Sequence, residues 1–186
     1  EGAAVSSVKC EGVAHEFSTI EGVKEDVTDI ILSLKELVCR LHGELDEVQV
    51  RLFKDRPGRV VAADIDVPAE LEILNPDHEI ATLADGGSLE MLLTIRRGTG
   101  YVPAEGNKTP ETVIGVIPID SIFSPVKRVS YRVESARVGQ RTDYDKLILD
   151  VATNGALAPE EALGQAAEIL MDRLAIFSDS DRARSG

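Results

Sequence analysis

Between Val38 and Pro118 the sequence is a succession of short apolar runs separated by turn residues, and this pattern most constrains the fold. The turn signals recur about every 8 to 12 residues, which is typical of antiparallel strands joined by hairpins. Pro57-Gly58, Asn75-Pro76 and Ala84 to Gly87 are such turns. The runs expected to be strands are 48–52, 60–63, 71–74, 79–83 and 88–95. The middle of the chain is therefore predicted to be a β-rich module.

Two other segments have the 3.6-residue period of an amphipathic helix. The first runs from Val23 to Leu37, and acidic residues crowd its first turns, where they favour the positive end of the helix dipole. The second begins at Pro159, a residue suited to the first helical position, and ends at Phe177. It has one apolar row at 163, 166, 167, 170, 174 and 177 and another at 162, 169 and 176. Either this helix is deeply buried, or one row packs on the chain's own sheet and the other on a partner helix.

Further strands are expected on both sides of the module. One covers Ala4 to Cys10 and extends to Phe17 after a kink at Gly12. Ser124-Pro125 marks a corner, after which 126–137 and 146–151 read as strands. The stretch from Glu105 to Glu111 is expected to be an exposed loop, and its formal glycosylation acceptor at Asn107 is interpreted as a chance match.

The distribution of charge along the chain limits the classes of molecule that it can bind. The 20 basic and 33 acidic residues give a net charge of −13, which argues against broad nucleic-acid binding. The segment from Pro125 to Gly155 is nevertheless basic, with six basic and four acidic side chains. It is either a docking stripe for an acidic partner or a phosphate, or a strand pair with Arg and Lys on its solvated face. No apolar run is long enough for a membrane span. The two cysteines, Cys10 and Cys39, are expected to be buried thiols in a reducing compartment.

The motifs of common active sites are missing from the sequence. It contains no phosphate-binding loop of the Walker type, and its three histidines are far apart with no Cys-x-x-Cys beside them, which disfavours a zinc site. Arg97 to Tyr101 is interpreted as a tight hairpin or bulge rather than a phosphate loop. Asp143 and Asp145 are candidates for a hard cation in a self-standing enzyme, but the simpler interpretation has Asp143 capping a bend before a strand at Lys146.

Several segments of the sequence, taken together, are specific enough to point to one protein family. They are VAHEFSTIEGVKEDV at 13–27, RGTGYVPA at 97–104, most of 123–155 from FSPVKR to TNG, and PEEA at 159–162. In this order they resemble the N-terminal domain of the alpha subunit of bacterial-type DNA-directed RNA polymerase, over nearly all 186 residues. In that family a strand and a helix precede the part that matches Glu1, and a small helical C-terminal domain follows the part that matches Gly186.

The resemblance implies an α+β fold with two subdomains: a helix-on-sheet dimerisation subdomain and a β-rich inserted subdomain. It assigns 2–123 to the insert, 124–177 to part of the dimerisation and assembly subdomain, and 178–186 to a flexible tail. It implies a homodimer, in the full-length subunit, that nucleates assembly of the beta and beta-prime subunits. Such a subunit is a non-catalytic part of a nucleotidyltransferase and holds no cofactor, since magnesium belongs to the large subunits. DNA contact would come only through the complex or the C-terminal domain, with no membrane association, in the bacterial cytoplasm or alternatively in a plastid.

The resemblance also implies roles for particular residues. Large-subunit contacts fall on Lys35, Arg128, Arg141 and Lys146. The dimer interface falls on Leu163, Ala167, Leu170, Leu174 and Phe177. An alternative function is a free regulatory adaptor that binds RNA polymerase without being its core subunit.

Overall fold

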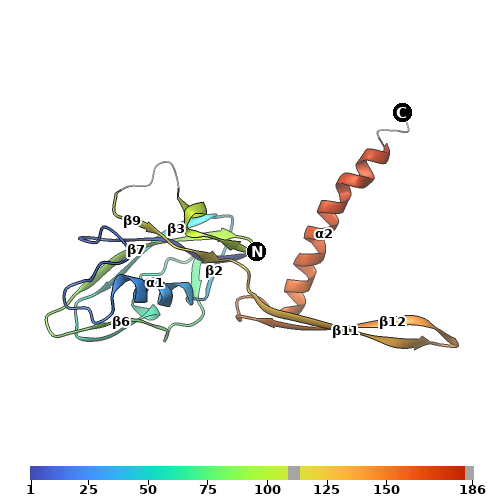
Figure 1. The fold of residues 1–186 in the computed structure, drawn as a ribbon, viewed down its shortest axis with the longest axis horizontal. Coiled ribbons are helices and arrows are strands. Elements are labelled where there is room, and N and C mark those ends of the chain that lie inside the picture. The colour runs from blue at the N-terminus through green and yellow to red at the C-terminus, as the bar shows by residue number, and fades with distance from the viewer. Residues whose placement is uncertain (109–113, 183–186) are drawn as a thin grey trace. The chain divides into compact units, whose positions relative to one another are not determined.

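The chain folds into two units, which are described separately. The computed structural model describes residues 1–108 and 114–182. Unit 1 comprises Glu1–Ser124 and unit 2 comprises Pro125–Gly186. Helices and antiparallel strands are both present, as Figure 1 shows, and the predicted α+β fold class is confirmed.

Unit 1 is built on an antiparallel sheet with the strand order β3-β7-β1-β2-β5, in which β9 also pairs with β1. Its strands are β1 (Gly2–Cys10), β2 (Cys39–Leu41), β3 (Glu47–Lys54), β5 (Leu71–Ile73), β7 (Leu89–Gly98) and β9 (Val116–Pro118). The central strand β1 pairs with β7 from Gly2↔Gly98 to Cys10↔Met91. The N-terminal strand thus lies in the middle of the sheet, next to strands from much later in the chain.

Two strand pairs and two 3-10 turns complete this unit. Strand β4 (Gly58–Val61) pairs with β6 (Glu79–Leu83), and β8 (Tyr101–Val102) pairs with β10 (Ser121–Ile122). The turns are η1 (Ala62–Asp64) and η2 (Ala104–Asn107). The expected strand at 60–63 therefore ends early, because Asp64 Oδ2 accepts a hydrogen bond from the Val61 N–H and turns the chain. The expected extension of β1 to Phe17 is absent, since Gly12 adopts φ = +79° in a turn.

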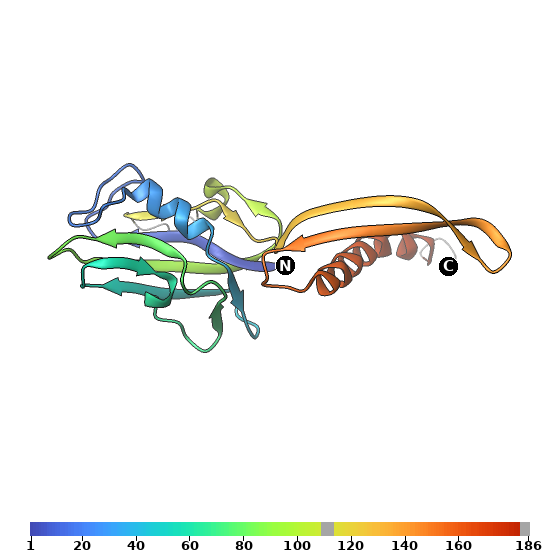
Figure 2. The ribbon, with the colours of Figure 1, turned by 90° about the horizontal axis from the view of Figure 1, so that it is seen from below.

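Helix α1 (Val27–Lys35) supplies the helical part of the core, shown in blue in Figures 1 and 2. It begins four residues later than predicted because Asp26 is the N-cap, with its side chain accepting from the Asp29 N–H at 2.9 Å. Val23 instead forms an isolated bridge with Leu83. The apolar side chains of α1 are buried with those of the sheet in one cluster, whose central members are Val8, Ile30, Leu34, Leu52, Leu93 and Ile95.

The two cysteines are buried and free, as the sequence predicted. Cys10 lies on β1 and Cys39 on β2. Burial raises the pKa of Cys39 to about 12 and is also the main cause of the raised pKa of Cys10. Since the thiolate is the reactive form, burial lowers the reactivity of both thiols at neutral pH.

Unit 2 is a long hairpin followed by a helix. The hairpin strands are β11 (Val126–Val138) and β12 (Arg141–Thr153), and α2 (Pro159–Arg182) follows. The turn at Gly139-Gln140 has Gly139 at φ = +62°, so β12 begins earlier than the predicted strand at 146. Helix α2 continues past Phe177, where the apolar period ends; residues 183–186 of the expected tail lie outside the described residues.

The start of α2 is capped despite Ala158, which cannot cap with its side chain. The Ala158 N–H donates to Glu161 Oε2 at 3.2 Å, which is the glutamate half of a capping box. The Ala162 N–H donates to the Ala158 carbonyl at 3.0 Å. Pro159 needs no acceptor because it has no N–H to satisfy.

Candidate functional site

Lys35 is the last residue of α1, where a cation interacts favourably with the helix dipole. Its Nζ lies 2.9 Å from Asp120 Oδ2, and its side chain is only 26% exposed. Neighbouring Leu34 is buried and fixes the end of the helix in the core. The predicted contact residue is therefore held by a partner within its own unit.

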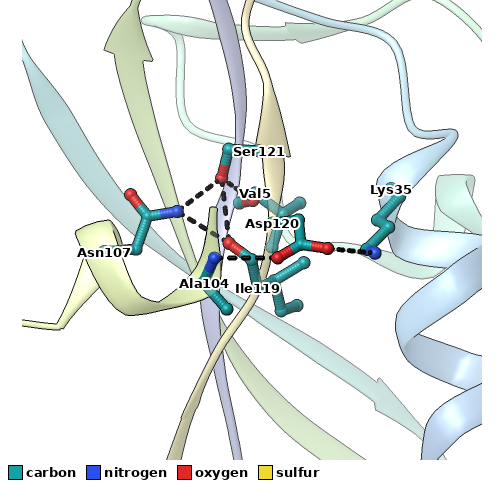
Figure 3. A network of polar contacts seen from close by, with 7 residues as sticks. All are labelled: Val5, Lys35, Ala104, Asn107, Ile119, Asp120 and Ser121. Atoms are coloured by element: carbon teal, nitrogen blue, oxygen red, sulfur yellow. Dashed lines mark hydrogen bonds and ion pairs between the residues drawn. The ribbon is translucent and has the colours of Figure 1, made fainter. Parts of the chain in front are cut away.

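Asp120 was not foreseen as a site residue. Figure 3 shows its carboxylate between two donors: Lys35 Nζ on one oxygen and the Ala104 N–H, at 2.8 Å, on the other. These bonds, with that from Lys35 the largest effect, hold the pKa of Asp120 below its usual value. Lys35 and Asp120 are 85 positions apart, and no spacing in the sequence connects them.

A buried polar cluster lies beside this pair (Figure 3). Asn107 Nδ2 donates to the Ile119 carbonyl at 2.7 Å and to Ser121 Oγ at 2.9 Å. Ser121 Oγ donates in turn to the Val5 carbonyl at 2.8 Å. The expectation that Asn107 lies in an exposed loop is thus wrong, since the residue is 9% exposed; residues 109–111 of that loop lie outside the described residues. The cluster joins η2 and β10 to β1.

The other three predicted contact residues lie on the hairpin of unit 2. Arg128 is opposite Ala152 and Lys146 is opposite Glu134, in register positions that share one face of the ribbon. Arg141 begins β12, with its guanidinium 5.3 Å from the centre of the Tyr144 ring and 3.3 Å from Asp143 Oδ2. All three side chains belong to exposed residues. The structure therefore brings these three onto one element, while Lys35 belongs to the other unit.

The opposite face of the hairpin is apolar. It carries the cross-strand pairs Val129↔Val151, Tyr131↔Leu149 and Val133↔Leu147. Within the described residues these side chains have little cover, and Tyr131 is 74% exposed. Sequence alternation had placed the apolar residues of β11 on one face, but it gave no sign that this face would lie open.

Helix α2 exposes its first apolar row and most of its second. All five predicted dimer residues are exposed, with Phe177 72% exposed, and Ile169 and Ile176 of the second row are exposed too. Of the α2 residues whose burial is described, only Ala162 is buried. The expectation that one row packs on the chain's own sheet, or that the helix is deeply buried, is therefore wrong. A two-stranded ribbon offers too little surface to bury a helix of this length.

The acidic pair of the hairpin has a structural explanation. Asp143 lies inside β12 and accepts from Arg141, so its predicted role as a cap before Lys146 is wrong. In the part of the chain that the structure describes, no three His, Cys, Asp or Glu side chains come together as a metal site would require.

In that same part, no helix is both long enough and apolar enough to span a membrane. Thr99 and Gly100 form a bend between β7 and β8, but these two strands pair with other strands, so the expected tight hairpin or bulge at 97–101 is wrong.

Comparison with known proteins gives one consistent result. A family model described as the RNA polymerase Rpb3/RpoA insert domain matches residues 8–124. The DNA-directed RNA polymerase subunit alpha of Carboxydothermus hydrogenoformans is 54% identical over 185 residues, covering 100% of this chain and 59% of that protein. The subunits of the same name from Symbiobacterium thermophilum and Alkaliphilus oremlandii are 57% and 56% identical, each over 95% of this chain and 56% and 55% of their own lengths. The chain thus spans a little over half the length of these relatives.

Proposed function

Because this chain belongs to the RNA polymerase Rpb3/RpoA insert domain family, we propose that it provides the assembly scaffold of a DNA-directed RNA polymerase alpha subunit. In this role it pairs with a second copy of the subunit and presents a platform for the beta and beta-prime subunits. Nucleotide addition and its magnesium belong to the large subunits, and DNA is reached through the assembled complex. The proposal places the chain in the bacterial cytoplasm.

One observation carries the scaffold role: the open apolar surface of unit 2. Leu163, Leu170, Leu174 and Phe177 of α2 are exposed in the described residues, as is the apolar face of the hairpin. Exposed apolar patches of this kind mark interaction sites in soluble proteins. We assign the α2 rows to self-association, because a helix with a continuous apolar stripe is suited to pack against its own symmetry mate.

The polar face of the hairpin is assigned to the large subunits. Arg128, Arg141 and Lys146 lie on a segment that is basic within an acidic chain. Charged groups of this kind steer a partner and fix its register when they are partly desolvated on binding. An acidic surface on a large subunit is therefore the expected complement.

The experiment that tests the scaffold role is co-purification of the full-length subunit with its polymerase. Arg128→Glu and Arg141→Glu are expected to reduce the recovery of a large subunit while the melting temperature stays near wild type, because both side chains are exposed. Arg56→Glu is the matched control, since it reverses one exposed charge in unit 1. Stoichiometric large subunits with wild type support the scaffold, whereas substoichiometric recovery indicates a regulatory adaptor. Unchanged assembly with both arginines reversed contradicts the assigned contact, and an equal loss of stability shows that they are structural.

A further inference from the structure

We propose that Asp120 is a positioning residue that holds the Lys35 ammonium group in place for an acidic group on a large subunit. This inference rests on the assembly function proposed above and on the large-subunit contact that the family resemblance implies for Lys35. It adds a residue that sequence reasoning did not identify, and it explains why a contact lysine has a partner inside its own unit.

The backbone on both sides of Asp120 is fixed by buried hydrogen bonds. The Ile119 N–H donates to the Ser6 carbonyl at 2.8 Å, and Ser121 Oγ donates to the Val5 carbonyl at 2.8 Å. Ile119 and Ser121 are both 1% exposed. Asn107 bonds to both of these residues and closes the arrangement from η2, as Figure 3 shows. The Cβ of Asp120 therefore has a position set by the central strand of the sheet.

The two carboxylate oxygens of Asp120 have different partners. The Ala104 N–H donates to Oδ1 at 2.8 Å, which sets the rotation of the carboxylate. That rotation directs Oδ2 to Lys35 Nζ at 2.9 Å. Asp120 thus links a rigid strand to the end of a lysine side chain, and the side chain of Asp120 remains 35% exposed.

Lys35 keeps donor capacity for another molecule. An ammonium group has three N–H donors. Among the described residues, the bond to Asp120 is the one that Lys35 Nζ makes, and the side chain is partly open to solvent. An incoming carboxylate therefore finds an ammonium that is already oriented. Because a free lysine must be ordered on binding, holding it in advance lowers the cost of association.

Asp120 also has an opposing effect. It neutralises part of the Lys35 charge, which weakens the attraction for a second carboxylate. The Asp120 carboxylate is partly exposed, so solvent screens its effect on a second carboxylate. The geometry that Asp120 imposes on Lys35 is not reduced by this screening. We therefore expect the positioning effect to exceed the competition, and the sign of the Asp120 effect on affinity distinguishes the two.

A double-mutant cycle in the full-length subunit tests the proposal. The affinities of the purified beta and beta-prime subunits are measured separately by fluorescence titration for wild type, Asp120→Asn, Lys35→Met and the double variant. We expect Lys35→Met to weaken one of the two affinities about tenfold or more and Asp120→Asn to weaken the same affinity about three- to tenfold. In the Lys35→Met background Asp120→Asn is expected to have no further effect, because its role acts through the lysine.

The chain offers a matched control in Lys54 and Asp64. Asp64 Oδ2 also accepts from a lysine, at 3.1 Å, and from a backbone N–H, that of Val61, at 2.9 Å. Asp64→Asn is expected to leave both affinities unchanged. This variant shows whether loss of any such pair in unit 1 disturbs assembly through general destabilisation.

The outcomes separate the two proposals. An unchanged or tighter affinity for Asp120→Asn overturns the positioning role, and so does an equal loss in the Lys35→Met background or a failure of Asp120→Asn to fold. If Lys35→Met leaves both affinities unchanged, the large-subunit contact at Lys35 is itself wrong and the role of Asp120 falls with it. Weakening by Lys35→Met alone preserves the contact and refutes only the inference about Asp120.

Discussion

At the scale of single residues, the polar groups of unit 1 explain much of what the sequence motifs left open. Asp120, Asn107 and Ser121 connect β1, η2 and β10 through hydrogen bonds between 2.7 and 2.9 Å. Glu25, in a phrase that carried the family resemblance, accepts from the Thr82 N–H at 2.7 Å and from Thr82 Oγ1 at 2.9 Å. These residues hold segments of unit 1 together that are far apart in the sequence.

The lowered pKa of Asp120 predicts a contribution to acid stability. The folded pKa is below the unfolded value of about 3.9, so the unfolded chain binds more protons in the interval between them. The contribution is therefore present above the unfolded pKa and is lost as the pH falls through the folded pKa. Urea unfolding at several pH values should show that the free energy of unfolding falls less steeply toward acid pH for Asp120→Asn than for wild type. Lys35→Met, which removes the largest cause of the shift, should reproduce part of the change; an unaltered acid limb in both variants contradicts the assignment.

Asn107 is expected to be a stability determinant rather than a surface residue. Asn107→Ala removes the donor to the Ile119 carbonyl and to Ser121 Oγ in a buried setting, and we expect the free energy of unfolding to fall by about 1–3 kcal/mol. Lys108→Ala, at the neighbouring exposed position, should change it by less than about 0.5 kcal/mol. Equal values for the two variants in denaturant titrations would show that water replaces the lost bonds.

At the scale of elements, the segment before α1 is fixed by a contact between two glycines. A Cβ on Gly22 would lie 2.6 Å from the Gly87 Cα, and Gly22 has φ = +79°. Lys24 and Ala84 add backbone hydrogen bonds between the same two segments. The phrase at 13–27 therefore includes a glycine that close approach requires, which a reading of its charged residues did not reveal.

This contact predicts different costs for two glycines with similar backbone angles. Gly22→Ala adds a clash to the strain of the left-handed conformation, whereas Gly86→Ala, at φ = +78° with open space around it, adds the strain alone. We expect a loss of about 1–2 kcal/mol for Gly86→Ala and a clearly larger loss for Gly22→Ala. Chemical denaturation of both variants measures the difference, and similar losses would mean that the loop moves freely to accommodate the methyl group.

The exposed rows of α2 predict a variant that affects association without affecting the fold. Leu170→Lys places a charge in the open apolar row, so we expect weaker self-association and a melting temperature near that of wild type. Asp172→Asn changes the net charge by the same amount on an exposed polar position of the same helix, and it should leave association unchanged. Sedimentation velocity with the full-length subunit provides the measurement. A large drop in stability for Leu170→Lys would instead show that the row is buried within the chain's own fold.

Local sequence patterns predicted most elements but not how all of them pack. The alternation of 88–95 and the helical period of Ile30 and Leu34 identify β7 and α1, because burial on one side imposes those periods. The pairing of β1 with β7 and the Lys35–Asp120 pair join residues that are far apart in the chain, and local periodicity does not predict such contacts. The exposed state of α2 likewise depends on distant parts of the chain. Two apolar rows indicated the need for a partner without identifying which surface would supply it.

At the scale of the whole molecule, the two units differ in how they are stabilised. The large buried cluster among the described residues runs from Val5 to Ile119 and lies entirely in unit 1. Phe123, which is buried against Gly98, lies next to the end of that unit. In the described part of unit 2, only Pro125 and Ala162 are buried.

This asymmetry predicts that unit 1 folds alone and unit 2 does not. A protein comprising residues 1–124 should unfold cooperatively in urea, because it keeps the whole cluster. A peptide of residues 125–186 should lack a cooperative transition, since a single hairpin and an exposed helix bury too little apolar surface. Circular dichroism of both proteins checks this. A cooperative transition in the shorter peptide would reveal a core that the described residues do not contain.

The open apolar surface of unit 2 has a consequence for how this sequence can change over time. Substitutions in the cluster of unit 1 are compensated by neighbours in the same chain, because those side chains touch one another. Under the scaffold proposal, Leu170, Phe177 and Tyr131 touch side chains of other polypeptides, so a change at these positions must be matched elsewhere. Correlated substitutions should therefore stay within the chain for unit 1 and cross between subunits for unit 2, where each symmetric α2 contact constrains both copies at once.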